Sequence, residues 1–414
     1  MNFYGRNLNG VYEFANMAAF LAGTPTRYQL RAPRPGGSRD DIPAAFTLKN
    51  TGLFVQDTWA VNYNLNVMAG VRVDMPSYSD QRLYNPRIEA EYGYNNTNLV
   101  DDKLVQPRVG FNYTFDSDRP TQLRGGVGLF GGAAPNVWLG GAYSNTGLNY
   151  QEYDLRNPGA IFTPDVNNPY VPGSAVAGRD NVDLVEPGTK LPSVWKANLA
   201  FDHELPWYGI TASAEVLFTK VNDALYFERL DITRGNGAPT AYGQDGRAIY
   251  WNAAGLNPAN DYINNGRSQG ITDGRNNAAN RATRPGWVGD VMLLRNTDKG
   301  RGAQATFALS KPMTDKWAWS LGYTYTDATE VSPLTSSQNT SNWNNTLVFN
   351  SNENVAYDSR YAIKDRITGT LEFKHNFFGD YATRFGMFYE GRSGRPFSYI
   401  YYNDVNGDSA STVL

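Results

Sequence analysis

The chain has 414 residues, a net charge of −3, a pI near 5.6 and no cysteine. The absence of cysteine excludes disulfide frameworks, thiolate metal sites and cysteine nucleophiles. No polybasic run is present, so we expect no nucleic-acid partner. Mean hydropathy is −0.51, although aromatic residues make up 14%. No stretch reaches the 18 or so apolar residues of a membrane helix, but the strands of a transmembrane β-barrel hide their apolar residues in alternation.

Residues 1–45 are rich in Gly, Asn, Arg and Pro, and we expect a mostly loop-like lead-in segment. The first regular pattern lies at Leu53–Asp74. From Leu65 onward every second residue is apolar and those between are mostly polar, as in a strand with one apolar face. The preceding run Phe46–Trp59 is also strand-like, so the two predict a β-hairpin that turns at Val61–Asn64.

The hairpin pattern recurs four more times, which predicts about ten strands. Connections within hairpins are short and those between hairpins are long, in strict alternation. An up-and-down sheet then has every short turn at one end and every long loop at the other, as in outer-membrane barrels. The short connections are Val61–Asn64, Asp116–Thr121, Pro206–Gly209, Pro312–Lys316 and Asn376–Tyr381, and the long ones are about Ser77–Leu104, Gly132–Ser193, Glu228–Trp287 and Thr329–Tyr361.

Two further features favour a membrane barrel over a soluble β-sandwich. Aromatic residues such as Trp59, Trp207 and Tyr381 cluster beside the short turns, where a membrane interface would hold them. Charged residues recur in mid-strand opposite the apolar face, as expected for a wet lumen. We therefore predict an all-β, antiparallel, up-and-down transmembrane β-barrel with short periplasmic turns and long extracellular loops. The predicted lumen-facing residues are Arg72, Arg108, Arg124, Glu215, Arg366, Glu372 and Arg384.

The run LFVQDTWAVNYNLNVMAGVRVD (53–74) resembles the signature hairpin of TonB-dependent receptor barrels. Three further runs resemble the Oar-like (OmpA-related) subgroup of Gram-negative bacteria, at 291–312, 319–343 and 389–408. The resemblance implies a barrel of about 22 strands, an N-terminal plug with a TonB box, and a carboxypeptidase-regulatory-like domain. This sequence shows none of the N-terminal parts and no aromatic C-terminal strand end, so we expect residues 46–414 to be part of a larger barrel.

The resemblance also implies the partners and the function. The partners would be outer-membrane lipid, the TonB complex through a plug outside this chain, and an unidentified extracellular ligand. The function would be TonB-dependent uptake, and the arginines favour anionic or peptide-like cargo. The alternatives are a passive porin-like or adhesin barrel and, less favoured, a soluble carbohydrate-binding β-protein. We expect no enzyme, because no acid, base and nucleophile assemble.

Two motifs match enzyme or cofactor patterns without the context that those patterns need. Residues 126–131 (GVGLFG) match a dinucleotide fingerprint, but a loop rather than a helix is expected to follow. We interpret these glycines as relieving crowding in the sheet. Residues 266–270 (GRSQG) match a nucleophile elbow, yet they lie in a long loop. The only histidines, His203 and His375, lie beside short turns at the opposite end.

The loops and the last predicted turn supply the remaining candidates. Asp404, Asn406 and Asp408 have the first three spacings of a calcium loop, and an Asx-rich turn is the competing interpretation. Aromatic side chains in the long loops are candidate ligand contacts, and ordinary loop packing is the alternative for each. These candidates are Trp138, Tyr143, Tyr170, Tyr250 and Trp251.

Overall fold

The structure is a computed structural model of the whole chain. The placement of the chain is described for residues 7–80, 82–133, 136–173, 180–232, 238–253, 256, 263–264, 267–268, 289–314, 316–401, 404–408 and 410.

The predicted hairpins form, and they pair side by side in one antiparallel sheet. Its main path runs β20-β19-β17-β16-β10-β9-β6-β5-β4-β3, so each strand lies beside its neighbour in this series. The up-and-down antiparallel prediction is therefore confirmed. The strands are β3 (Leu48–Ala60), β4 (Leu65–Tyr78), β5 (Leu104–Thr114), β6 (Thr121–Gly131), β9 (Ser193–Glu204), β10 (Thr211–Arg229), β16 (Arg301–Thr314), β17 (Trp317–Glu330), β19 (Asp365–Phe378) and β20 (Tyr381–Arg392).

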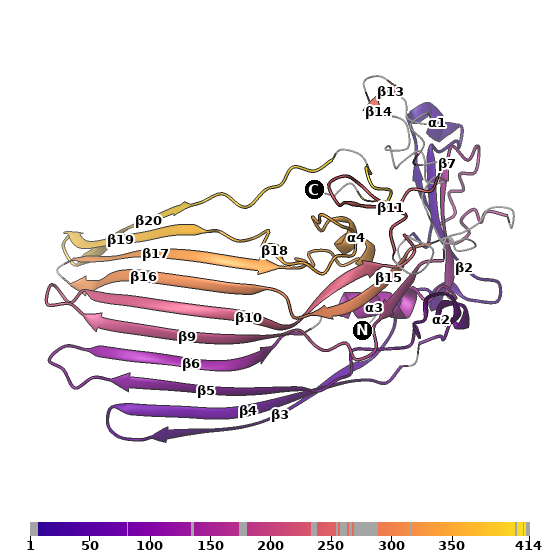
Figure 1. Ribbon diagram of the computed structural model, residues 1–414. Coiled ribbons are helices and arrows are strands. Elements are labelled where there is room, and N and C mark those ends of the chain that lie inside the picture. Colours follow the sequence, from indigo (N-terminus) through magenta and orange to yellow (C-terminus); the bar gives the residue numbers. More distant parts are fainter. Residues whose placement is uncertain are drawn as a thin grey trace.

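The sheet is an open arc with β3 and β20 at its edges (Figure 1). Within the described ranges each of these two strands has one sheet neighbour. All short turns lie at one end of the arc, and the long segments fold at the other, as the alternation of loop lengths predicted. No helix in the described part of the chain is long and apolar enough to cross a membrane.

Strand register divides the sheet into two faces of opposite character. Directly opposed residues in an antiparallel ladder share a face. Arg72 opposes Gln106. The pairing continues from strand to strand as far as β20, so the residues that share a face with Arg72 can be identified on every strand. All seven predicted lumen-facing residues lie on it, and we call it the polar face. The apolar face carries Val71, Val109, Val127, Leu199, Val216, Phe307, Leu321, Ile367 and Met387.

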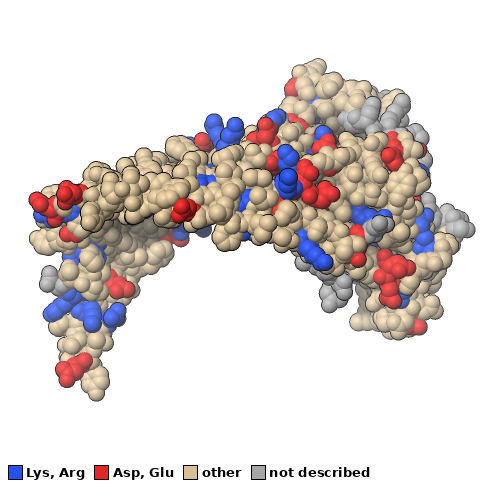
Figure 2. All heavy atoms as spheres, turned by 90° about the horizontal axis from the view of Figure 1, so that it is seen from below, with Lys and Arg blue, Asp and Glu red and all other residues tan. Residues whose placement is uncertain are grey.

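Among the described residues, side chains on the apolar face remain largely exposed. Leu199 is 46% exposed, Phe307 57% and Met387 63%. A contiguous exposed apolar surface of this extent is unusual in a soluble monomer and marks contact with a membrane or a partner. Charged side chains lie over the loop end of the molecule and also at the short-turn end of the strands (Figure 2).

Glycines in β6 allow close approach of neighbouring strands. A Cβ atom on Gly125 would lie 2.7 Å from the carbonyl oxygen of Asn198, and one on Gly126 would lie 2.8 Å from that of Val109. Both neighbours are backbone atoms and cannot move aside cheaply. All six residues of the GVGLFG motif lie within β6, and these contacts agree with the interpretation that its glycines relieve crowding in the sheet. The expectation that a loop rather than a helix follows was wrong, because helix α3 (Asn136–Ser144) begins shortly after the motif.

The long segments fold into a crown over one end of the sheet, which we call the loop crown. Residues 7–45 contribute two strands to it, β1 and β2, which form a separate three-stranded sheet with β7 in the order β1-β2-β7. We had expected this part of the chain to be mostly loop. The elements are β1 (Val11–Glu13), α1 (Met17–Leu21), β2 (Arg27–Pro33), η1 (Arg39–Asp41), α2 (Pro86–Tyr92), α3 (Asn136–Ser144), β7 (Tyr150–Arg156), β8 (Val182–Val185), β11 (Ala241–Tyr242), β12 (Ala248–Ile249), β13 (Ile263–Asn264), β14 (Arg267–Ser268), β15 (Val291–Thr297), α4 (Asn339–Asn344) and β18 (Tyr357–Asp358).

The hydrophobic core lies in the crown and not within the sheet. β10 extends past the sheet and pairs with β15, which in turn pairs in parallel with β8. Met292, Leu293 and Leu294 of β15 are at most 1% exposed. They pack in two clusters with side chains of the other long segments. The crown is thus a packed body that can hold residues in fixed positions.

Candidate ligand-binding site

A cavity of about 440 Å³ lies where the polar face meets the crown. We call it the inner pocket. Its floor is the polar face of β3 to β6, and its apolar wall includes Tyr78, Phe130 and Leu191. Asn136 and Leu139 of α3 form part of its lining. Its size and mixed lining are those of a small-molecule site.

Helix α3 is held over the polar face by aromatic packing at both of its ends. The indole Nε1 of Trp138 donates to the Ser336 carbonyl oxygen at 2.8 Å. Tyr143 stacks on Phe46 with ring centroids 4.5 Å apart, and its hydroxyl donates to the Asp80 carbonyl oxygen at 3.0 Å. These contacts fix α3 above the strands, so the inner pocket is built into the fold.

A polar network orders one side of the inner pocket. Arg72 donates to both carboxylate oxygens of Asp74, from Nε at 2.8 Å and Nη2 at 2.6 Å. Gln106 donates from Nε2 to Asp74 and accepts from the Gly131 backbone N–H at 2.7 Å. The charge of Arg72 is therefore neutralised by Asp74.

Arg108 is different, because the structure gives it no carboxylate partner among the described residues. Its guanidinium lies over the Phe130 ring, 5.4 Å from the centroid. Contact with a ring face leaves the N–H donors at the guanidinium edge free for a ligand. The inner pocket thus combines one uncompensated cation, amide groups and apolar walls, which suits an anion attached to an apolar or peptide-like body.

The other predicted polar-face residues lie outside the inner pocket. Arg124 pairs with Asp202, Arg366 pairs with Glu390 at 2.9 Å, and Glu215 accepts from Asn198 at 3.3 Å. Register places Glu372 opposite Gly386, and Arg384 opposite Lys374, near the short-turn end. Of the seven, the structure brings only Arg72 and Arg108 together in one cavity.

The five loop aromatics predicted as ligand contacts separate into two groups. Trp138, Tyr143, Tyr250 and Trp251 are between 2% and 8% exposed, and the first three belong to the main core cluster. Ordinary loop packing accounts for where these four lie. Tyr170 is 37% exposed, and its carbonyl oxygen accepts from the Tyr28 hydroxyl at 2.6 Å. Its role in ligand contact stays a prediction.

The remaining sequence motifs fall in separate places. Asp404, Asn406 and Asp408 are buried in the crown, at 5%, 0% and 1% exposure. In the part of the chain that is described, no group of three or more His, Cys, Asp or Glu residues is arranged to hold a metal. The GRSQG motif lies mostly outside the described residues. His203 Nδ1 lies 2.8 Å from the Thr121 hydroxyl at the short-turn end.

Sequence reasoning missed a second cavity, of about 270 Å³, which we call the crown pocket. Its lining includes Arg31, Asn145, Glu152, Asp183 and Asn339, which come from separate segments of the chain. Asp183 accepts from Asn145 Nδ2 at 2.7 Å, and burial raises the pKa of its carboxyl to about 6. The one signal in the sequence was an acidic residue inside the short apolar run of β8.

The comparison with protein-family models agrees with this architecture. A family model described as "Outer membrane beta barrel domain" matches residues 1–412. Among solved structures, the chain is similar to "Copper transporter OprC" at 14% identity and a TM-score of 0.39, over 81% of this chain and 34% of that one. It is also similar to the outer membrane transporter YddB from Escherichia coli at 11% identity and a TM-score of 0.41, over 85% of this chain and 35% of that one. The chain thus spans about a third of either structure. No curated protein sequence matches it significantly.

Proposed function

The chain belongs to the outer membrane β-barrel domain family, and on this premise we propose that it is part of a receptor that takes up its ligand in a TonB-dependent manner. The family places the ten-stranded sheet in the outer membrane, where lipid covers the exposed apolar face. Backbone groups in hydrocarbon must all be paired, so a spanning sheet has to close into a barrel. The polar face then lines the lumen, with Arg72, Arg108 and Arg124 among the residues along it.

The observation that carries this proposal is the free guanidinium of Arg108 beneath α3. A passive pore needs an open path, whereas here a packed helix lies over the polar face and encloses a pocket. A receptor needs a place where a ligand is held before it is moved, and the inner pocket provides one. An anionic or peptide-like ligand would pair its carboxylate with Arg108 and lay its body on the apolar wall.

The test measures accumulation of acidic tripeptides that carry an uncharged fluorescent dye in the intact producing cells, with uncharged, C-terminally amidated tripeptides that carry the same dye in parallel. We expect uptake of the acidic pool to fall at least about tenfold in Arg108→Gln, because loss of one charge-assisted pair costs roughly 1.5–3 kcal/mol. Lys103→Gln removes the same charge from an exposed residue just before β5 and should leave uptake unchanged.

The energy source separates this proposal from a passive barrel. A protonophore should abolish uptake through a TonB-dependent receptor, because the inner-membrane proton gradient drives it. Uptake that continues at full rate with the protonophore present would contradict TonB dependence and support a porin. Equal uptake of both peptide pools by wild type and Arg108→Gln would contradict the role of the inner pocket.

A further inference from the structure

Helix α3 separates the crown pocket from the inner pocket. Asn136 and Leu139 line the inner pocket. Gly140, Gly141 and Ser144 line the crown pocket. The members of each set are three or four residues apart, so each set follows one side of the helix. The crown pocket is therefore a cavity of its own, and a ligand bound in it would leave the inner pocket unoccupied.

Carboxylates outnumber cations around the crown pocket. The described part of its lining holds Glu152, Asp183 and Asp290 and one basic residue, Arg31. Arg31 is already paired with Glu152 at 2.9 Å. Asp290 is paired with Arg229 at 2.7 Å. Within the described lining, Asp183 is thus the carboxylate that forms no ion pair.

Asp183 receives its hydrogen bonds from uncharged groups. It is 4% exposed, and Asn145 Nδ2 donates to its Oδ2 at 2.7 Å. The buried guanidinium of Arg82 makes no hydrogen bond to it, because all three nitrogens of that group lack a partner among the described residues. Burying a carboxylate without a counter-charge is costly, so a cation that entered the crown pocket would find an unpaired partner there.

Asn339 supplies an independent observation. It lines the crown pocket, it is 5% exposed, and its Oδ1 has no hydrogen-bond partner in the described part of the chain. Its Nδ2 lies near Asp183, since a Cβ atom on Gly141 would be 3.1 Å from that nitrogen and would collide with Asp183 Oδ2. Buried amide oxygens nearly always have a partner. An N–H group of a ligand would supply the one that Asn339 lacks.

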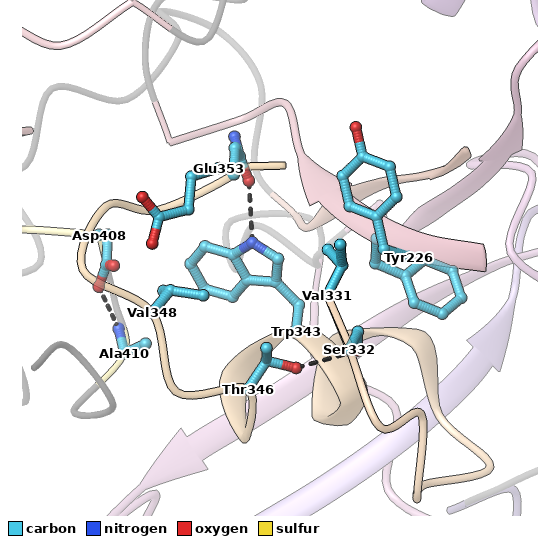
Figure 3. A pocket seen from close by; sticks show the side chains of 11 residues that line it. Tyr226, Val331, Ser332, Trp343, Thr346, Val348, Glu353, Asp408 and Ala410 are labelled. Atoms are coloured by element: carbon cyan, nitrogen blue, oxygen red, sulfur yellow. Dashed lines mark hydrogen bonds between the residues drawn. The ribbon is translucent and has the colours of Figure 1, made fainter. Parts of the chain in front are cut away.

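Asn339 is the first residue of α4, and this short helix is anchored by a tryptophan. Figure 3 shows the Trp343 indole between Val331 and Val348. The indole Nε1 donates to Asn352 Oδ1 at 2.8 Å. The anchored helix holds Asn339 near Asp183, so the polar groups of the crown pocket are in place before a ligand binds.

We propose that the crown pocket binds a small primary ammonium ion, with Asp183 and Asn339 as acceptors. An ammonium group carries a positive charge and three N–H donors but no acceptor, which suits a carboxylate without an ion pair beside an amide oxygen without a partner. The cavity of about 270 Å³ has room for a short carbon chain behind the nitrogen. A metal ion fits less well, because no three His, Cys, Asp or Glu of the described residues are arranged to hold one.

Calorimetric titration of the purified chain in detergent tests this site, which is independent of the uptake proposal. The probe is n-butylammonium chloride. Tetramethylammonium carries the charge without N–H donors, and n-butanol has the same carbon chain without the charge. We expect n-butylammonium to bind at one site, at least about tenfold more tightly than either of the other probes, because hydrogen bonds to a charged group are the strong ones.

Three calorimetric results would overturn the proposal. The first is the absence of saturable n-butylammonium binding. The second is binding of n-butylammonium no tighter than that of tetramethylammonium or n-butanol. The third is binding of glucose but not of n-butylammonium, which would make the crown pocket a site for neutral sugars.

Variants assign the binding to the two acceptors. Asp183→Asn keeps the shape of the side chain and removes its charge, so it should weaken n-butylammonium binding at least about tenfold. Asn339→Ala should also weaken binding, because it removes the second acceptor. Asp358→Asn changes an exposed carboxylate in β18 and should bind as wild type does. Wild-type affinity in Asp183→Asn would contradict the assignment.

A measurement without mutation covers the case in which a variant fails to fold. The wild-type melting temperature at pH 7.5 should rise by roughly 1–3 °C in about 50 mM n-butylammonium chloride, relative to the same concentration of tetramethylammonium chloride. Equal melting temperatures in the two salts would overturn the proposal.

Discussion

The Arg72 guanidinium donates to both carboxylate oxygens of Asp74, from Nε to Oδ2 at 2.8 Å and from Nη2 to Oδ1 at 2.6 Å. The two residues lie two positions apart on the same face of β4. Asp74 is 8% exposed, and Gln106 also donates to it. This pair sets the charge of the inner pocket, because it neutralises one arginine and leaves Arg108 as the cation that a ligand meets.

The Arg72–Asp74 pair should contribute measurably to stability. Arg72→Gln and Asp74→Asn should each lower the free energy of unfolding, because each removes one side of an ion pair joined by two hydrogen bonds. The double variant should be little worse than either single variant, because one interaction is lost in all three. Urea unfolding in lipid vesicles measures the three values.

The exposed pair Arg366–Glu390 is the matched control, with side chains 48% and 30% exposed. Its coupling energy should not exceed about 0.5 kcal/mol. If the two pairs show equal coupling, Arg72 and Asp74 do not form the ordered pair that the inner pocket requires.

Gly126 should be intolerant of a side chain. Gly126→Ala places a Cβ atom 2.8 Å from a backbone carbonyl oxygen of β5, so the strands must separate or shift. We expect a loss of roughly 1–3 kcal/mol, as for overpacking, visible as a lower temperature of unfolding in a heat-modifiability gel. Gly386→Ala in β20 meets no atom within 4 Å and should behave as wild type. A wild-type melting temperature for Gly126→Ala would refute the crowding argument.

Asp183 should make the crown less stable as pH rises. Its folded-state pKa, about 6, lies above the ordinary value of 3.8, so the folded state holds the proton more tightly than the unfolded state. The protonated Asp183 carboxyl carries no penalty for burying a charge. The free-energy cost of burying the ionised carboxylate develops between about pH 4 and pH 6. At neutral pH it amounts to roughly 3 kcal/mol, from 1.36 kcal/mol per unit of pKa difference.

Asp183→Asn removes this cost and keeps an oxygen that can accept from Asn145. Its melting temperature should exceed that of wild type at pH 7.5, and the difference should shrink at pH 4. Thermal unfolding followed by tryptophan fluorescence at both pH values measures this. A difference that is constant with pH would show that Asp183 does not titrate between them.

The sheet could be predicted from the sequence because its signal is local. Alternation from Leu65 to Val73 requires one apolar and one polar face, and the short turns fix which strands pair. The glycines of β6 could be assigned to a strand in the same way, although the sequence did not indicate helix α3, which follows them at Asn136–Ser144. The seven charged residues then fall on one face as a direct result of register.

The crown could not be predicted, because its structure depends on contacts between distant segments. Trp138 and Tyr250 are aromatic residues of the kind that often contacts ligands, yet they are buried against strands and helices from other long segments. The parallel pairing of β15 with β8 joins residues more than a hundred positions apart. The link between Trp138 and Ser336, likewise, has no local sequence signal.

The central claim is that lipid covers the apolar face of the sheet and water the polar face. The chain has no cysteine, so a single introduced cysteine is the only thiol of this chain that a reagent can label. Ala305 and Ala308 lie in the same strand, β16, but on opposite faces: Ala305 opposes Val216 and Ala308 opposes Ser213. In outer-membrane vesicles, a membrane-impermeant thiol reagent should label Ala308→Cys rapidly and leave Ala305→Cys unmodified. Equal labelling of the two variants, or labelling of Ala305→Cys alone, would contradict this account.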